Sequence, residues 1–282
     1  MSLDLENVRS VVETALAEDL RYGPDATTSA TVPESATALA EITPRVPGTI
    51  AGLPVALAVF DSVLGKDYEV LGTRKDGERL FPGEPALVLR GSARGLLTAE
   101  RTALNLLCHL SGIATATAAW VCEVDGTACA IRDSRKTLPG LRLLQKYAVR
   151  AGGGVNHRMG LGDAVLIKDN HVVAAGSVTA ALRAVREQAA ELPCEVEVDT
   201  LDQLREALDA GADEVLLDNF TPAGCAKAVR LRDERAAKTR LEASGGLRLE
   251  NARAYAETGV DYLSVGALTH SSPALDLGLD LH

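Results

Sequence analysis

The sequence lacks the features that mark secreted, disulfide-rich and membrane-spanning proteins. Its first twenty residues contain neither a basic region nor an apolar core, so we expect no secretory signal and a cytoplasmic location. No apolar run approaches the ~18 to 20 residues that a membrane span needs, and the longest candidate, residues 50–60, is interrupted by Pro54. Small buried thiols are expected rather than disulfides or a zinc site, because the five cysteines are odd in number, widely spaced and without a CxxC pair: Cys108, Cys122, Cys129, Cys194 and Cys225.

Positive charge is also scarce overall, but it is concentrated in one place. The chain has 29 Lys and Arg against 39 Asp and Glu, a formal net charge of -10, which argues against nucleic acid as a partner. Residues 131–171, in contrast, hold eight Lys and Arg, two His and three Asp, so this basic island is about +5. Its Pro139-Gly140 and Gly152-Gly153-Gly154 turns allow backbone amides to approach a ligand closely. The island therefore predicts binding of a small, highly anionic ligand.

The first third of the chain has the pattern of a small mixed domain. With 46% hydrophobic and 24% charged residues, the 282-residue chain is typical of one large or two ordinary globular domains. Apolar residues recur at helical spacing over residues 8–20, and the Tyr22-Gly23-Pro24-Asp25 stretch ends that helix. Residues 37–90 alternate short β-prone runs with proline and glycine, which predicts a small antiparallel sheet.

Residues 92–124 have a strong helical pattern, with Ser92 as a plausible N-cap. Leucines at helical spacing form an apolar stripe, and Gly112 is expected to divide the stretch into two helices. Arg101 lies beside the stripe and by itself is typical of a solvated arginine, while His109 is typical of a packing histidine. The helically spaced cations of the basic island are interpreted as a solvated helix face: Arg142, Lys146 and Arg150.

The second half repeats a unit of short apolar strand and amphipathic helix. Strand ends recur every ~20 to 30 residues, the spacing of right-handed βα units. This pattern predicts a parallel α/β barrel or open sheet. The expected strands are Ala164–Ile167, Glu195–Val198, Glu214–Leu217, Leu241–Ala243 and Tyr262–Val265.

Charged or glycine-rich residues follow each of these five strands. In a β/α barrel the loops after the strands converge on the active site. Asp199, which precedes a helix, is by itself typical of a helix cap. The full set is nevertheless difficult to explain by a hydrophobic core: Lys168, Glu197 with Asp199, Asp218 with Asn219, Ser244-Gly245-Gly246, and Gly266.

The last two strand ends predict a phosphate site. Ser244, Gly245 and Gly246 follow one strand, and Val265-Gly266-Ala267 follows the next. Barrel enzymes commonly bind a phosphate on backbone amides at this place. A lone SGG is weak evidence, but the pair of turns one βα unit apart favours a phosphate monoester.

Glu197 and Asp218 are one βα unit apart, so their carboxylates are expected to meet at the barrel mouth. Without a partner they would repel each other, and Mg²⁺ or donating ribose hydroxyls would relieve that repulsion. Together with the phosphate turns, these carboxylates predict a site for a phosphorylated sugar that carries a metal-bound pyrophosphate.

The basic island supplies the remaining wall of this site. Its strongest candidates for contact with a ligand lie on loops or at a strand end, where functional residues concentrate. Arginine suits bidentate capture of carboxylates or phosphates, and lysine acts as a point charge. In each adjacent pair we expect one side chain to face the ligand and the other to contact protein. The members are Arg135 with Lys136, His157 with Arg158, and Lys168.

Taken together, these motifs resemble those of the quinolinate phosphoribosyltransferase family. The resemblance covers residues 101–270 and is carried by RTALNLLCHLSGIAT, RDSRKTLPGLR, KYAVRAGGGVNHRMGLGDAVLIKDNH, EVEVD, LLDN, EASGG and VGALTHS. Cys108 and Ser134 depart from the commoner choices, although Ser134 keeps the hydroxyl of the usual threonine. The resemblance implies an N-terminal α/β sandwich domain (1–112), an incomplete parallel α/β barrel (113–267) of the type II phosphoribosyltransferase kind, and a C-terminal segment (268–282) that returns to the first domain.

The resemblance also implies residue roles and partners. It implies a homodimer, or an assembly of dimers, in which Arg101 reaches into the partner's site and His270 supports the site. Arg135, Lys136, His157, Arg158 and Lys168, with Ser134, would contact quinolinate or the anionic donor, and Lys136, Lys168, Glu197 and Asp218 form the implied catalytic set. Glu197 and Asp218 would hold the ribose hydroxyls and Mg²⁺, directly or indirectly, and the 5-phosphate would lie on Ser244, Gly245, Gly246, Val265, Gly266 and Ala267.

The implied reaction transfers a phosphoribosyl group from phosphoribosyl diphosphate to quinolinate, with decarboxylation, in NAD biosynthesis. Its products are nicotinate mononucleotide, pyrophosphate and CO₂. The residues leave three alternatives open: a transferase acting on another ring acid such as nicotinate, a sugar-phosphate lyase or isomerase with Lys168 as a Schiff-base amine, and a non-enzymatic phosphometabolite-binding protein. Two acceptor carboxylates need more paired cations than one, so the basic wall favours quinolinate.

Overall fold

The computed structural model describes residues 3–282, which form two compact units. The first runs to residue 118 and includes residues 137–153 and 268–282; the second comprises residues 119–136 and 154–267. These units differ from the expected boundaries at residues 112 and 267 chiefly because residues 137–153, inside the basic island, belong to the first unit.

The first unit contains the small antiparallel sheet that the sequence predicts. Strand order is β12-β1-β5-β3, and a separate two-stranded ribbon pairs β2 with β4. Because β12 pairs with β1 from Ala40 to Pro44, the C-terminal segment completes a sheet that begins near the N-terminus. The strands are β1 (Thr37–Pro44), β2 (Gly48–Thr49), β3 (Tyr68–Thr73), β4 (Arg79–Leu80), β5 (Leu87–Ser92) and β12 (Leu277–Leu281).

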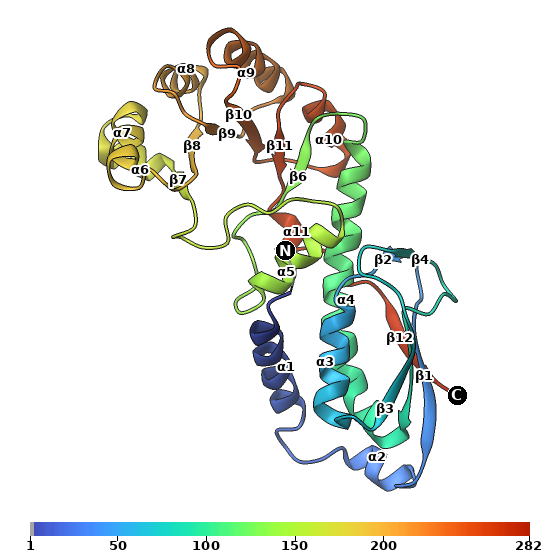
Figure 1. Cartoon of the computed structure of the whole chain (residues 1–282). Helices are drawn as coiled ribbons and strands as arrows, with labels where there is room; N and C mark the ends of the chain where they lie inside the picture. Colours follow the sequence, from blue (N-terminus) through green and yellow to red (C-terminus); the bar gives the residue numbers. More distant parts are fainter. Residues whose placement is uncertain (1–2) are drawn as a thin grey trace. The chain divides into compact units, whose positions relative to one another are not determined.

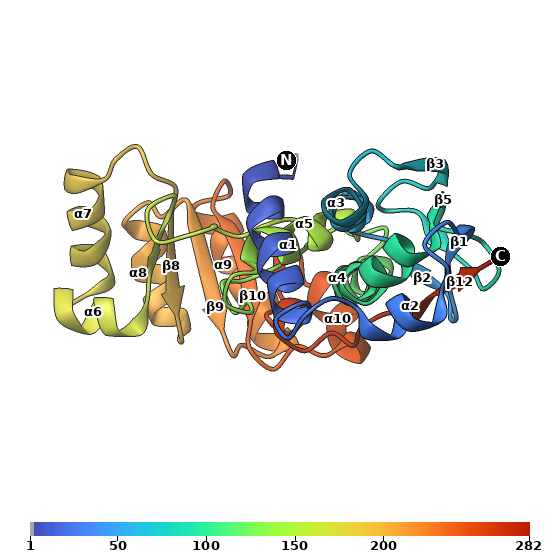
Figure 2. The same cartoon turned by 90° about the horizontal axis from the view of Figure 1, so that it is seen from below.

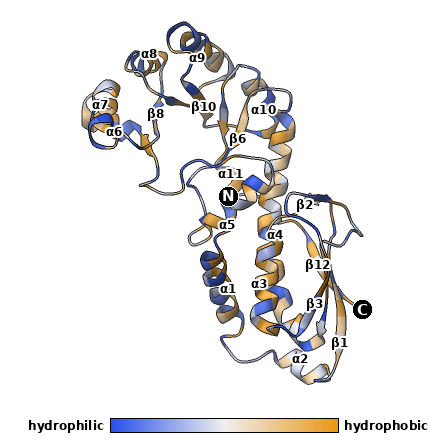
Figure 3. Cartoon of the chain, viewed as in Figure 1, coloured by the Kyte–Doolittle hydropathy of each residue, from blue (hydrophilic) through white to orange (hydrophobic). Residues whose placement is uncertain are grey.

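Two apolar helices, α3 and α4, cover one face of this sheet (Figures 1 and 2). Both are largely hydrophobic in Figure 3, and their buried residues include Phe60, Leu96 and Leu107. Burial of such side chains contributes ~1.5 to 3 kcal/mol each. The helices of this unit are α1 (Leu5–Asp19), α2 (Ala26–Thr31), α3 (Leu53–Leu64), α4 (Ala93–Glu123, to residue 118) and α5 (Arg142–Ala151).

Helix α4 is one continuous helix, so the expected break at Gly112 is wrong. A Cβ at Gly112 would clash with the carbonyl oxygen of Pro273, so the glycine permits close packing of the C-terminal segment rather than ending the helix. By length and composition α4 could also cross a membrane, contrary to the expectation that no stretch would. However, 56% of its most apolar window is buried, as in the core helix of a globular domain.

The second unit is built on a parallel six-stranded sheet. Its strand order is β6-β11-β10-β9-β8-β7, and helices α7 to α10 lie along one side of the curved sheet (Figure 1). All five predicted strands are present, while β6 was not predicted. The elements are β6 (Ala130–Arg132), β7 (Val165–Ile167), α6 (Asp169–Ala175), α7 (Val178–Gln188), β8 (Cys194–Val198), α8 (Leu201–Asp209), β9 (Glu214–Asp218), α9 (Pro222–Arg235), β10 (Arg240–Ser244), α10 (Leu249–Ala256) and β11 (Tyr262–Ser264). Helix α11 (Ala267–His270) begins at the last residue of this unit, and its residues 268–270 belong to the first unit.

Three other local expectations are corrected. Thr200, not Asp199, caps α8, because its hydroxyl accepts from the Gln203 N–H in a capping box. Lys146 is fully buried rather than solvated, and α5 also buries Leu144, Gln145, Ala148 and Val149. Of the five free thiols, Cys129 and Cys225 are buried as expected, but Cys122 is exposed.

Candidate active site

The polar strand ends of the second unit lie at one edge of the parallel sheet. Ser244 pairs with both Asp218 and Ser264, so β9, β10 and β11 end at the same level. Glu197 lies one residue before the end of β8, and Lys168 directly follows β7. Hydrogen-bonded register therefore brings together residues that are up to about 100 positions apart in sequence.

Lys168 and Glu197 form an ion pair across neighbouring strands. Lys168 Nζ lies 2.8 Å from Glu197 Oε2, and the lysine side chain is 48% exposed whereas that of the glutamate is 13% exposed. The lysine thus reaches solvent while its charge is held by a largely buried carboxylate. This arrangement leaves the ammonium group accessible to an anionic ligand.

Asp218 lies among other acidic groups. Burial, followed by the nearby Glu197 and Asp199 carboxylates, raises the pKa of Asp218, while Lys168 and Lys136 oppose the shift. Asn219 adopts a left-handed conformation (φ 56°) and donates from Nδ2 to Asp218 Oδ2 at 2.7 Å. Asparagine tolerates this conformation better than most residues, so the turn after β9 orients the aspartate.

The two predicted phosphate turns follow neighbouring strands. Gly245 and Gly246 both have positive φ, at 86° and 63°. A Cβ at Gly245 would clash with Asn219 Oδ1, whereas a Cβ at Gly246 would meet no atom within 4 Å. The SGG turn is therefore tightly packed on its Asp218 side and open at Gly246. The backbone N–H of Val265 donates to the Arg132 carbonyl, so it is already engaged within the protein.

The Ser134–Lys136 loop starts two residues beyond β6. The Ser134 hydroxyl accepts from the Lys136 N–H at 3.1 Å, Ser134 and Arg135 are half-buried, and Lys136 is exposed. Serine in place of the commoner threonine thus keeps a turn-forming hydroxyl. Arg135 and Lys136 therefore differ in their exposure.

Hydrogen bonds to neighbouring residues hold His157 and Arg158 in place. The fully buried Asp133 accepts from the His157 N–H at 2.9 Å and from Asn156 Nδ2 at 2.5 Å. Arg158 donates from Nη1 to the Ala164 carbonyl. Burial, followed by repulsion from Arg135, lowers the pKa of Arg158. A nearby anion would favour the charged form of Arg158 and so oppose this shift.

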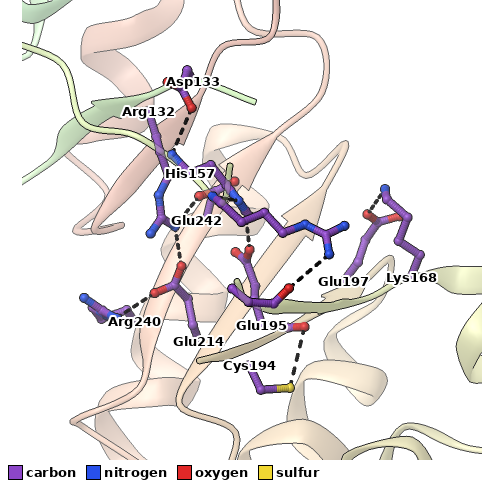
Figure 4. A network of polar contacts seen from close by, with 12 residues as sticks. Arg132, Asp133, His157, Lys168, Cys194, Glu195, Glu197, Glu214, Arg240 and Glu242 are labelled. Atoms are coloured by element: carbon purple, nitrogen blue, oxygen red, sulfur yellow. Dashed lines mark hydrogen bonds and ion pairs between the residues drawn. The ribbon is translucent and has the colours of Figure 1, made fainter. Parts of the chain in front are cut away.

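A buried charge network lies beneath these residues, and the sequence reasoning missed it (Figure 4). Arg132 Nη1 contacts Glu214 Oε1 and also Glu242 Oε2, the latter at 2.7 Å, while its guanidinium stacks 4.1 Å from the centre of the Tyr262 ring. His157 Nε2 lies 2.7 Å from Glu195 Oε2. The sequence did contain one signal for this network. Glu195 lies two residues before Glu197 on the same strand, and residues two apart on a strand face the same side of the sheet.

Burial strongly perturbs two carboxyls of this network. It raises the pKa of Glu195 to about 8, with a further contribution from Glu214. It raises the pKa of Glu242 to about 7, with a further contribution from Glu195. Among the described residues, His157, Glu195 and Glu242 form one possible metal-ligand group, with ligand atoms within 4.8 Å of one another. Arg132 already supplies a cation beside Glu242, so a second cation there would be repelled.

Most of the chain matches one family. Residues 25–111 match the model of the quinolinate phosphoribosyl transferase N-terminal domain, and residues 113–280 match that of the C-terminal domain. The chain belongs to the quinolinate phosphoribosyl transferase family.

Individual family members agree over nearly the full length. The chain is 61% identical over 279 residues to the carboxylating nicotinate-nucleotide pyrophosphorylase of Mycobacterium leprae, covering 99% of this chain and 98% of that protein. It is 41% identical over 239 residues to the enzyme of the same name from Homo sapiens, covering 83% of this chain and 79% of that protein. The structure of the nicotinate-nucleotide pyrophosphorylase from Francisella tularensis superposes with a TM-score of 0.94 at 37% identity, over 100% of this chain and 98% of that one.

Two site residues predicted from the family resemblance belong to the first unit. Arg101 is 65% exposed on α4, and its nearest carboxylate is Glu100 at 3.8 Å. His270 is exposed at the end of α11, and its Nδ1 lies 2.6 Å from Ser271 Oγ. Their roles in the site of this chain remain predictions.

Glu197 and Asp218 have the chemistry that Mg²⁺ requires. Each carries carboxylate oxygens, the hard ligands that this ion prefers. Burial raises the pKa of Asp218, and repulsion from the Glu197 carboxylate adds to the shift. A bound cation would remove that repulsion. These residues therefore fit a magnesium ion held by the protein directly or through water.

Proposed function

We propose that the chain transfers the phosphoribosyl group of phosphoribosyl diphosphate to quinolinate and releases CO₂, giving nicotinate mononucleotide for NAD biosynthesis. The observation that carries this proposal is the convergence of cations on the sheet edge that also holds Glu197 and Asp218. Quinolinate brings two carboxylates and the donor brings phosphates, so the reactants require such a concentration of positive charge.

We assign the acceptor to the wall of Ser134, Arg135, His157 and Arg158. Arg135 and Arg158 repel each other in the protein alone, and a dicarboxylate would relieve that repulsion. Lys136 and Lys168 are exposed cations whose charges oppose the rise in the pKa of Asp218, so we assign them to the pyrophosphate side of the donor. Positioned charges of this kind contribute ~2 to 4 kcal/mol each to a transition state.

We assign the donor sugar to Glu197 and Asp218 and its 5-phosphate to the Ser244–Gly246 and Val265–Ala267 turns. Mg²⁺ held by the two carboxylates would neutralise charge on the departing pyrophosphate. The carboxylates themselves would accept hydrogen bonds from the ribose hydroxyls and fix the anomeric carbon toward the ring nitrogen. Attack by that nitrogen makes the ring an electron sink, so the electron pair of the bond to the 2-carboxylate moves into the ring, CO₂ leaves, and the ring carbon takes a proton.

We further propose a cytoplasmic homodimer with shared sites. Its support is the family membership together with Arg101, an exposed arginine within a long, largely buried helix. In this arrangement Arg101 and His270 of the first unit complete a site on a partner subunit. A dimer also explains why a highly exposed cation would face an anionic substrate.

The deciding experiment supplies purified protein with quinolinate, phosphoribosyl diphosphate and Mg²⁺, and follows nicotinate mononucleotide and CO₂ together. Equal amounts of the two products, lost on adding a chelator and restored by excess Mg²⁺, are expected. Nicotinate replaces quinolinate in a parallel reaction. Ribosylation of nicotinate without turnover of quinolinate would refute the acceptor assignment but keep the donor site.

A further inference from the structure

Glu195 stands out among the buried residues because the proposed reaction gives it no task. It lies on β8 two residues before Glu197, is 4% exposed, and is close enough to Glu214 to be repelled by it. Buried carboxylates cost free energy, and an apolar residue at this position would commonly be as stable. A contribution to stability alone therefore does not explain Glu195.

A side-chain hydrogen bond with His157 ties Glu195 to the substrate wall. Glu195 Oε2 lies 2.7 Å from His157 Nε2, as Figure 4 shows. At the other side of the imidazole, the Arg158 backbone N–H donates to Nδ1 at 2.7 Å. A backbone N–H can only donate, so Nδ1 is the acceptor and the ring hydrogen lies on Nε2. His157 therefore donates to Glu195, and this bond fixes both the tautomer and the ring plane.

The main chain of the same loop has a separate anchor. Asp133 accepts from the His157 N–H and from Asn156, and Val155 forms a parallel bridge with Arg132. Loss of the Glu195 carboxylate would thus release the imidazole while the loop backbone stays in place. The imidazole in turn accepts a hydrogen bond at Nδ1 from the backbone N–H of Arg158 and so holds that residue.

We propose that Glu195 is a positioning residue that orients His157, and through it Arg158, for binding of the acceptor carboxylates. This inference rests on the proposed assignment of His157 and Arg158 to quinolinate. Glu195 itself does not touch the substrate. A group that orients the residue making the contact commonly decides whether that contact is formed.

The test compares Glu195→Ala and Glu195→Gln by steady-state kinetics with each substrate varied in turn. Glu195→Ala is expected to raise KM for quinolinate about tenfold, the effect of losing one hydrogen bond, with KM for phosphoribosyl diphosphate unchanged within about twofold. Glu195→Gln is expected to stay within about threefold of wild type for both, because its amide oxygen accepts the same bond from Nε2.

Two further variants make the result decisive. Glu214→Ala removes a neighbouring buried carboxylate that contacts Arg132 and Arg240, and it is expected to leave both KM values within about twofold. His157→Ala is expected to raise KM for quinolinate at least as much as Glu195→Ala. Thermal unfolding of every variant checks the fold.

Each alternative outcome contradicts a different statement. Wild-type kinetics of Glu195→Ala beside an impaired His157→Ala would refute the positioning role and keep the site. Wild-type kinetics of His157→Ala would refute the assignment of His157 to the acceptor. A parallel rise of both KM values in Glu195→Ala, or failure of Gln to restore binding, would show that Glu195 acts only on the fold or by its charge.

Discussion

Lys168 Nζ lies 2.8 Å from Glu197 Oε2, so the two strands β7 and β8 present an ammonium and a carboxylate as one unit. The ion pair joins Lys168, which we assign to the pyrophosphate, to Glu197, which we assign to the ribose. Each charge compensates the other until substrate arrives.

Lys168→Ala is expected to lower kcat/KM by about 30-fold to 1000-fold, because a preorganised charge contributes ~2 to 4 kcal/mol to the transition state. The fold should survive, since the lysine side chain is half exposed. Arg205→Ala, which removes an exposed cation paired with Asp202 on α8, is the matched control and should be fully active. Wild-type turnover by Lys168→Ala would remove this residue from the site.

Gly245→Ala and Gly246→Ala should distinguish the effect of a steric clash from that of backbone strain in the proposed phosphate turn. Both positions have positive φ and would be strained by about 1 kcal/mol or more, but only at Gly245 would the new Cβ clash, with Asn219 Oδ1. We therefore expect Gly245→Ala to raise KM for phosphoribosyl diphosphate more than Gly246→Ala does. Equal effects, measured with quinolinate saturating, would contradict the role of the Asn219 contact.

Gly112→Ala in α4 is expected to destabilise the protein. Helix propensity alone predicts a gain of about 1 kcal/mol, because alanine is the better helix former. The Cβ would instead clash with the Pro273 carbonyl, so the C-terminal segment must shift. Chemical denaturation measures whether the substitution lowers or raises the free energy of unfolding. A higher free energy of unfolding would show that this packing is unimportant.

The stability of the protein should fall as pH rises toward 8, partly through Glu242. Its pKa is about 7 in the folded protein against an ordinary glutamate value of 4.5, so the native state binds more protons than the unfolded state between these values. Stability from this group is fully present below pH 4.5 and is lost as pH rises through about 7, a change of about 3 kcal/mol. Glu242→Gln is expected to flatten the pH dependence of the free energy of unfolding. An unchanged slope would show that Glu242 does not titrate in this range.

Mixing two inactive variants should test the shared sites. If Arg101 serves the partner, a mixed dimer of Arg101→Ala and Lys168→Ala contains one site free of both substitutions. After subunit exchange, random pairing should restore about a quarter of wild-type activity. Native mass spectrometry monitors the exchange of subunits. If mixed dimers form and activity does not recover, Arg101 lies outside the partner's site.

Local pattern was sufficient for much of the architecture. Turn residues between short β-prone runs predicted the antiparallel sheet, and the βα rhythm predicted all but β6 of the parallel strands. The strand β6 (Ala130–Arg132) was missed because it precedes the part of the sequence in which the βα rhythm repeats, and its pairing with β11 is not visible in the local pattern. Gly112 was misjudged because glycine breaks an isolated helix but also permits close packing against a distant segment.

The sequence by itself determined the family, the order of strand ends and the types of residue at the sheet edge, since motif spacing and charge are properties of the chain alone. Only the tertiary structure decided which charges meet. Arg132, Glu195, Glu214 and Glu242 come from four different strands, and parallel register places them in one buried network. Burial and neighbouring charge set the protonation and orientation of such groups, and both arise only when the strands pair.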